Sequence, residues 1–141
     1  MTSEGHWHSA VVYQVYWRSF KDGNGDGIGD LKGLRSKIGY LSSLGVDAIW
    51  LNPTYPSPQG DHGYDVSNYF DVDPLFGTLE ELEQAIDEFH DHGMAVLLDI
   101  VPNHVSSQHP WFISAKEGGH GHEAESRFII RQGKGDSGGT P

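Results

Sequence analysis

Apolar residues along the chain follow two spacings, short continuous runs and repeats of three and four residues. Residues 11–16 are β-branched or aromatic except for Gln14, which predicts a first strand. Residues 48–51 and 95–101 are two further apolar runs of strand length. Continuous runs of this kind are typical of strands covered on both faces, as in a parallel sheet.

The helical spacing occurs between these strands. Residues 31–44 carry leucine and isoleucine at intervals of three and four, with Asp30 placed to cap the start of a helix. A second helix is predicted to begin at Thr78, where a capping-box pattern occurs, and to end before Gly93. The order strand, helix, strand, helix, strand predicts an α/β fold with a parallel sheet covered by helices.

Two segments depart from this alternation. Residues 52–77 are rich in proline and glycine and too long for an ordinary connection, so we expect them to carry function. After residue 102 the apolar signal weakens: residues 127–130 can form a strand, and residues 132–141 have the composition of a flexible loop. Because a sheet of three parallel strands exposes two edges and an inner face, we expect it to need more chain or a partner.

The composition narrows the classes of partner and the location. The 141 residues include 20 acidic and 9 basic side chains, which gives a formal net charge of −11. Nucleic acids and anionic membranes attract basic surfaces, so neither is expected as a partner. The sequence has no cysteine, no apolar signal segment at its start and no apolar run of transmembrane length. We therefore expect a soluble, cytoplasmic protein.

The segment Lys-Asp-Gly-Asn-Gly-Asp-Gly-Ile-Gly-Asp at residues 21–30 places oxygen-bearing side chains at alternate positions. The spacing reproduces the opening of an EF-hand calcium loop, but Gly33 stands where the closing Glu belongs. We predict a structural metal site in another fold, with Ca²⁺ favoured over Mg²⁺ because a flexible loop suits the looser geometry of calcium. An ordinary solvated turn is the alternative. The predicted ligands are Asp22, Asn24, Asp26, the carbonyl of Ile28, and Asp30.

Six histidines form pairs two residues apart, a spacing that can chelate a metal on a strand. In a helix, however, residues two apart point about 200° away from each other. The remaining pairs lie in terminal or glycine-rich segments. We expect solvated surface residues rather than ligands. The pairs are His6 with His8, His90 with His92, and His120 with His122.

Four segments, in this order, resemble the α-amylase family, glycoside hydrolase family 13, and within it the α-glucosidases and oligo-1,6-glucosidases. They are Tyr-Gln-Val-Tyr-Trp-Arg-Ser-Phe at 13–20, the loop at 21–30, Gly-Tyr-Asp at 63–65 and Asp-Ile-Val-Pro-Asn-His at 99–104. The resemblance implies a (β/α)8 TIM barrel. Residues 1–103 would supply strands 1–3 and helices 1–2 of that barrel, and residues 104–141 would begin the inserted subdomain B and end in a glycine-rich loop.

The resemblance also implies a glucose-binding site at the carboxyl ends of the strands. Positions matching Tyr64, Asp65 and His104 line the subsite of the glucose whose bond is cut, and the residue matching Asp99 braces that subsite. Their chemistry suits a sugar, since carboxylate and imidazole groups bind hydroxyls and a tyrosine ring packs on a pyranose. An ordinary strand-end carboxylate and a surface histidine are the alternatives for Asp99 and His104. Asn103 matches a calcium ligand of the family's amylases, and we assign it no such role here.

The activity implied is retaining hydrolysis of α-glucosidic bonds in disaccharides or short oligosaccharides. The family's nucleophile and acid/base follow later strands, beyond residue 141, and the retaining mechanism needs a carboxyl pair about 5 to 5.5 Å apart. We therefore expect this chain to contribute glucose-binding residues and a metal site but no catalytic residue. The remaining barrel is expected on a second polypeptide, the rest of the same enzyme after cleavage in the glycine-rich segment.

Two other functions stay open from the sequence. Trehalose synthases and sucrose isomerases of the family transfer or rearrange the glucosyl group through the same intermediate. A non-catalytic sugar-binding fragment is the second alternative. The family's transporter subunits, which are non-catalytic, carry a membrane span before the barrel, and this sequence shows none.

Overall fold

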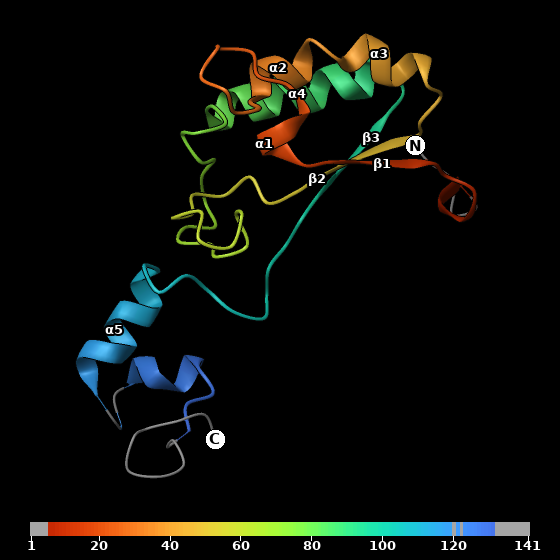
Figure 1. Cartoon of the computed structure of the whole chain (residues 1–141). Coiled ribbons are helices and arrows are strands. Elements are labelled where there is room, and N and C mark those ends of the chain that lie inside the picture. The colour runs from red at the N-terminus through yellow and green to blue at the C-terminus, as the bar shows by residue number, and fades with distance from the viewer. Residues whose placement is uncertain (1–5, 120, 122, 132–141) are drawn as a thin grey trace.

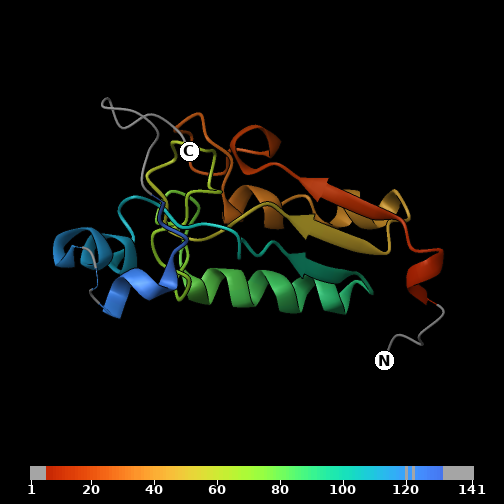
Figure 2. The ribbon, with the colours of Figure 1, turned by 90° about the horizontal axis from the view of Figure 1, so that it is seen from below.

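The computed structural model describes residues 6–119, 121 and 123–131, which include a three-stranded parallel sheet (Figures 1 and 2). The strands are β1 (Val12–Val15), β2 (Ala48–Leu51) and β3 (Ala95–Leu98), with β2 in the centre. All three predicted strands are confirmed, although β3 is shorter than expected. It ends at Leu98 because β2, its partner, ends at the paired residue Leu51.

Helices accompany the strands in chain order. Figure 1 shows α2, α3 and α4 together on one side of the sheet. The short helices and the long α4 account for the remaining regular structure of the described residues. They are η1 (His6–His8), α1 (Trp17–Phe20), α2 (Leu31–Arg35), α3 (Ile38–Ser43), α4 (Leu79–Asp91), α5 (Pro110–Gly118) and η2 (Glu123–Arg127).

The capping predictions are confirmed by hydrogen bonds at both helix starts. The Asp30 carboxylate accepts the backbone N–H of Gly33 at 2.6 Å. At α4, the Thr78 hydroxyl accepts the N–H of Glu81, and the Glu81 carboxylate accepts the N–H of Thr78. Each bond satisfies a donor that the first helical turn leaves unpaired, so these local patterns set where the two helices begin.

The prediction of one helix over residues 31–44 is wrong, because the segment divides into α2 and α3. The Ser36 hydroxyl donates to the carbonyl of Gly33 at 2.6 Å, and the N–H of Lys37 bonds to Leu34 instead of continuing the α-helical ladder. Side chains that bond to nearby carbonyls compete with helix hydrogen bonding, and a glycine in each short helix lowers helix propensity further. Leu31, Leu34, Ile38 and Leu41 still face the core, whereas Leu44 is 50% exposed.

The predicted strand at residues 127–130 is also wrong. Residues 123–127 form η2, and the chain after it has no regular structure up to residue 131. The Phe128 ring instead meets Phe112 of α5 edge to face, with centroids 5.7 Å apart. Phe128 is therefore used in packing against α5, whereas Ile129 is 91% exposed. Figures 1 and 2 show this helical pair beyond the carboxyl ends of the strands.

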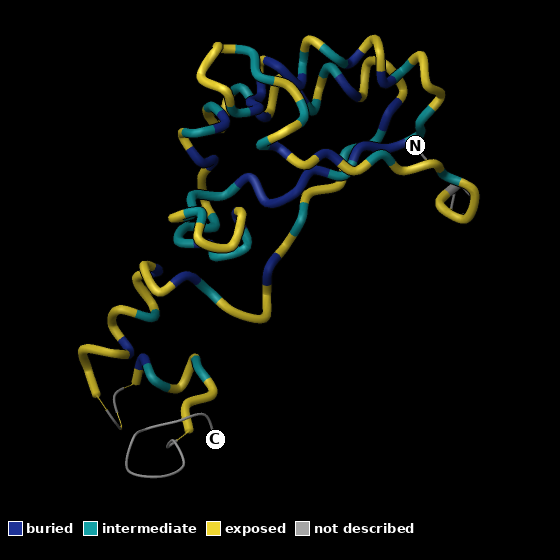
Figure 3. Tube along the Cα trace, viewed as in Figure 1, coloured by how far each residue is buried: buried dark blue, intermediate teal, exposed yellow. Residues whose placement is uncertain are grey.

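The hydrophobic core lies between the sheet and its helices (Figure 3). Val15, Ile49 and Leu51 from the strands meet Leu34 and Phe89 from the helices, and all five are at most 1% exposed. Other strand residues remain open to solvent, with Val12 42% and Leu98 46% exposed. The expected uncovered face of the sheet is thus present. No helix among the described residues is long and apolar enough to cross a membrane.

Gly33 and Gly39 make a matched pair of helical glycines for a stability test. A Cβ at Gly33 would lie 1.9 Å from the carbonyl oxygen of Lys21, whereas a Cβ at Gly39 meets nothing within 4 Å. We expect Gly33→Ala to lower the free energy of unfolding by at least about 2 kcal/mol, because backbone must move. Gly39→Ala should raise it by up to about 1 kcal/mol. Thermal unfolding of both variants checks this, and equal melting temperatures would contradict it.

Candidate functional site at the strand ends

Polar side chains from all three strands meet at the carboxyl end of the sheet. Gln14 lies on β1, Asn52 follows β2 directly, and Asp99 follows β3 directly. Tyr64 comes from the long segment between β2 and α4 and joins them. The Gln14 amide donates to Asn52 Oδ1 at 3.0 Å, and Asn52 Nδ2 donates to the Tyr64 hydroxyl at 3.1 Å. That hydroxyl donates to Asp99 Oδ2 at 2.7 Å.

His104 is held against the same tyrosine. Its Nε2 lies 3.1 Å from the backbone carbonyl of Tyr64, and its Nδ1 lies 3.2 Å from the amide nitrogen of Asn103. Because an amide nitrogen only donates and a carbonyl only accepts, the ring fits as the tautomer with its proton on Nε2. The structure therefore brings together three of the four predicted sugar-binding residues, Tyr64, Asp99 and His104.

The hydroxyl of Tyr64 stays protonated in this setting. Burial raises its pKa to about 12, helped by the hydrogen bond to Asp99 and by the negative charges of Asp99 and Asp61. Tyr64 therefore keeps its donor at neutral pH and binds the Asp99 carboxylate throughout the physiological range.

The fourth predicted residue, Asp65, is turned into its own loop. Its Oδ1 accepts the Ser57 hydroxyl at 2.6 Å and the N–H of Asp61 at 3.1 Å, and its Oδ2 accepts the N–H of Gly60 at 3.0 Å. Burial disfavours the charged carboxylate, but these hydrogen bonds outweigh it and lower the pKa of Asp65. This carboxylate braces the turn that presents Tyr64.

Three residues of this neighbourhood were missed from the sequence. Gln14 lies in the apolar run of the first strand and within the motif at 13–20, but it was given no role there. Asn52 opens the long segment and follows a predicted strand directly, just as Asp99 does. Asp61 is exposed, and its charge acts on Tyr64. A search for polar residues at every strand end would have found Asn52.

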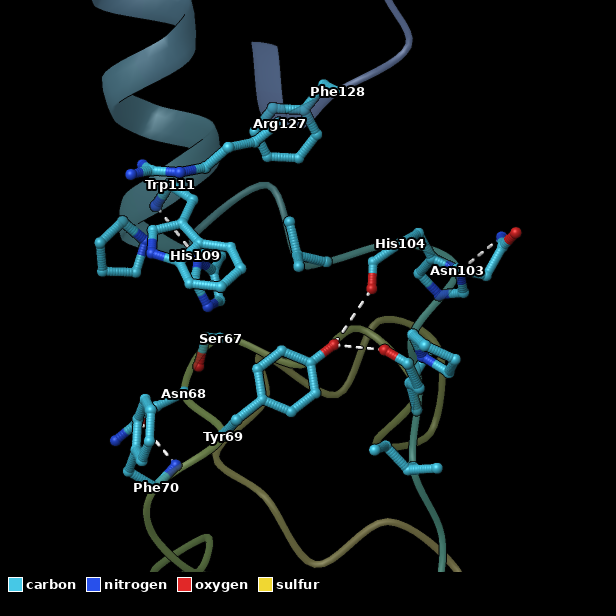
Figure 4. Close-up of a pocket in the computed structure, with 15 residues that line it drawn as sticks. Ser67, Asn68, Tyr69, Phe70, Asn103, His104, His109, Trp111, Arg127 and Phe128 are labelled. Carbon is cyan, nitrogen blue, oxygen red and sulfur yellow. Dashed lines mark hydrogen bonds between the residues drawn. The ribbon is translucent and has the colours of Figure 1, made fainter. Parts of the chain in front are cut away.

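A cavity of about 700 Å³ lies beside this cluster (Figure 4). Residues 67–70 and 100–105 form one side, and the start of α5 with Arg127 and Phe128 forms the other. The Tyr69 hydroxyl donates to the carbonyls of Val101 and His104, which holds the segment that carries His104 (Figure 4). The cavity shares His104 with the cluster but does not include Tyr64 or Asp99.

The predicted metal loop is folded by its own side chains. Asp22 accepts the N–H groups of Asn24, Gly25 and Gly27, and the bonds to Gly25 and Gly27 are the main cause of its lowered pKa. Asp26 accepts the N–H of Ile28. Asp30, the fifth predicted ligand, is buried and caps α2 while also accepting the N–H of Gly23.

All the predicted metal ligands in this loop are oxygen atoms, the type that Ca²⁺ and Mg²⁺ prefer, so their chemistry fits either ion. Within the described part of the chain, no group of three or more His, Cys, Asp or Glu is close enough together to hold a metal. His8, His90 and His92 are exposed, as predicted. His120 and His122 lie outside the described residues, as does the side chain of His6.

Comparison with known proteins gives this geometry its context. The model of the alpha-amylase catalytic domain matches residues 14–141. The chain belongs to the alpha-amylase family. A probable alpha-glucosidase of Rhizobium meliloti is 53% identical over 110 residues, which are 78% of this chain and 20% of that protein. A probable oligo-1,6-glucosidase of Bacillus subtilis is 46% identical over 135 residues, 96% of this chain and 24% of that protein.

Solved alpha-amylase family structures are similar as well. A mutant of the trehalulose synthase MutB is 48% identical with a TM-score of 0.88, over 92% of this chain and 23% of that one. The alpha-glucosyl transfer enzyme XgtA is 41% identical with a TM-score of 0.89, over 96% of this chain and 25% of that one. The chain thus spans a fifth to a quarter of these relatives' length. Its three parallel strands are part of the family's (β/α)8 barrel.

Proposed function

We propose that this chain forms part of the glucose-binding site of a retaining α-glucosidase that acts on disaccharides or short oligosaccharides. The observation that carries the proposal is the cluster of Tyr64, Asp99 and His104 at the carboxyl ends of the strands, where barrels of this kind bind their substrates. The similarity to proteins named alpha-glucosidase and oligo-1,6-glucosidase supports it.

Each residue of the cluster has a part in this proposal. The Tyr64 ring offers a face for the C–H side of a glucose ring, and Asp99 and His104 offer polar atoms to sugar hydroxyls or to residues that bind them. Asp65 contributes indirectly by holding the turn. Asp61, exposed in that turn, offers a further carboxylate without a side-chain hydrogen bond to the described residues.

Glucosyl transfer or isomerisation is the second candidate, because the trehalulose synthase MutB and the transfer enzyme XgtA have closely similar folds. The complete protein should be incubated with maltose, isomaltose and sucrose separately, and the products separated by chromatography. Free glucose from a single disaccharide supports hydrolysis, and a new disaccharide supports transfer or isomerisation. Absence of any product would leave the non-catalytic sugar-binding function.

The metal site stays part of the proposal. We infer that Asp22, Asn24, Asp26, the Ile28 carbonyl and Asp30 can hold a structural Ca²⁺, which would add to folding stability because the unfolded loop binds it poorly. We expect EDTA to lower the melting temperature and added Ca²⁺ to restore it, with Mg²⁺ less effective. The same treatment should leave Asp22→Ala unaffected. A wild-type melting curve that EDTA does not move would contradict the site.

The organisation of the whole protein is proposed from the same comparisons. We expect residues 1–103 to belong to the barrel and residues 104–141 to begin subdomain B, which the separate packing of α5 on η2 supports. A cytoplasmic location stays a prediction.

A further inference from the structure

Gln14, Asn52, Tyr64 and Asp99 form a chain of hydrogen bonds that runs in one direction. Asp99 as a carboxylate only accepts, so the Tyr64 hydroxyl donates its hydrogen bond to Asp99 Oδ2 at 2.7 Å. The Tyr64 oxygen is then left to accept, and Asn52 Nδ2 is its donor at 3.1 Å. The Asn52 amide is thereby oriented with Oδ1 toward Gln14, whose Nε2 donates at 3.0 Å. Position 52 therefore needs an amide, which carries both a hydrogen-bond donor for Tyr64 and an acceptor for Gln14.

Asn52 is held firmly enough to transmit this orientation. The residue is 7% exposed, its N–H donates to the carbonyl of Val15, and its carbonyl accepts the indole N–H of the buried Trp17 at 2.9 Å. Its backbone is thus fixed to β1 and α1, and its amide can turn only about its own side-chain bonds. Tyr64, by contrast, belongs to a long segment without regular structure.

We propose that Asn52 is a positioning residue that fixes the Tyr64 side chain for sugar binding. Asp99 alone holds the Tyr64 hydroxyl by one bond, at the end of β3. The bond from Asn52 holds the same oxygen from a second direction, at the end of β2, and Gln14 extends this contact to β1. The orientation of the sugar-facing ring therefore depends on all three strands. This inference rests on the proposed function and adds residues that touch Tyr64 rather than the sugar.

The test compares variants of the complete protein by the inhibition constant of glucose and by kcat/KM with maltose. Asn52→Ala removes the donor, and Asn52→Asp keeps the volume but replaces the donor by an acceptor next to the Tyr64 oxygen. Loss of one buried hydrogen bond corresponds to about a tenfold weaker glucose affinity and a similar loss of kcat/KM in both variants. Thr54→Val is the control, because Thr54 is also buried, lies two residues further along the chain and is replaced by a side chain of similar volume.

The outcomes separate this inference from the proposed function. If wild-type protein neither binds glucose nor acts on any α-glucoside, the proposed function fails. If wild type is active and Asn52→Asp retains its glucose affinity, the donor at position 52 is not needed and the inference is overturned. Crystal structures add a readout independent of activity: we expect a displaced Tyr64 ring in both Asn52 variants and an unchanged ring in Thr54→Val. An unchanged ring in Asn52→Ala would also overturn it.

Discussion

Replacing Asp99 by Ala should lower kcat/KM for α-glucosides by at least about 100-fold in the complete protein. The change removes the acceptor of the hydrogen bond from the Tyr64 hydroxyl, and it removes a half-buried negative charge at the carboxyl end of β3. Bonds to charged groups contribute about 1.5 to 3 kcal/mol each, and under the proposed function Asp99 would make a further one when a sugar is bound. Initial rates of glucose release over a range of maltose concentrations give the value.

Two further variants make the Asp99 result interpretable. Asp99→Asn keeps an oxygen that accepts the hydrogen bond from Tyr64 but loses the charge. The activity of this variant should therefore lie between those of wild type and Asp99→Ala. Asp87→Asn removes an exposed carboxylate on α4, a helix that contributes no residue to the cluster, and should change nothing. Activity of Asp99→Ala within twofold of wild type would exclude Asp99 from the sugar site and leave it as a strand-end carboxylate.

Replacing Phe89 by Ala should destabilise the protein by about 3 to 5 kcal/mol. Phe89 is fully buried on α4 and is among the largest buried side chains of the core. Truncation loses the transfer free energy of the ring and leaves a cavity between helix and sheet. The urea concentration at half unfolding should fall, with α4 and the sheet losing structure together.

Phe70 provides a matched control for this core substitution. It is also a phenylalanine, but it lies in the long segment after β2 and is 87% exposed. Phe70→Ala should therefore change the free energy of unfolding by less than about 0.5 kcal/mol. Equal destabilisation by the two substitutions would mean that the ring of Phe70 is covered in the complete protein and that the core contribution of Phe89 has been overstated.

Local sequence patterns predicted those parts of the fold whose causes are local. The run at 48–51 needed only its apolar residues, and the start of α4 needed only the pair formed by Thr78 and Glu81. The break between α2 and α3 was not predicted, because the Ser36 hydroxyl that bonds to the carbonyl of Gly33 does not disturb the apolar spacing. The strand expected at 127–130 failed because apolar β-formers pair only when a neighbouring strand is present, and η2 precedes them instead.

The candidate site shows the same division. Tyr64, Asp99 and His104 were found because each lies in a short sequence motif, at 63–65 or 99–104. Gln14 and Asn52 meet only in three dimensions, 38 residues apart along the chain. Asp65 was assigned to the sugar from the same motif as Tyr64, yet its bonds to Ser57 and to the turn at 60–61 depend on how the loop closes. Which member of a motif faces outward is a property of the folded loop.

The parallel pairing of the strands has a consequence for how this region folds. Paired residues of β1 and β2 are 36 positions apart, as in Val12 with Ala48, and those of β2 and β3 are 47 apart, as in Ala48 with Ala95. Closing such loops costs chain entropy before any ladder bond is gained, which makes parallel sheets slow to form. Helix α4, with its own cap, can form within microseconds. The strand ends, and with them the cluster around Tyr64, are therefore expected to assemble last.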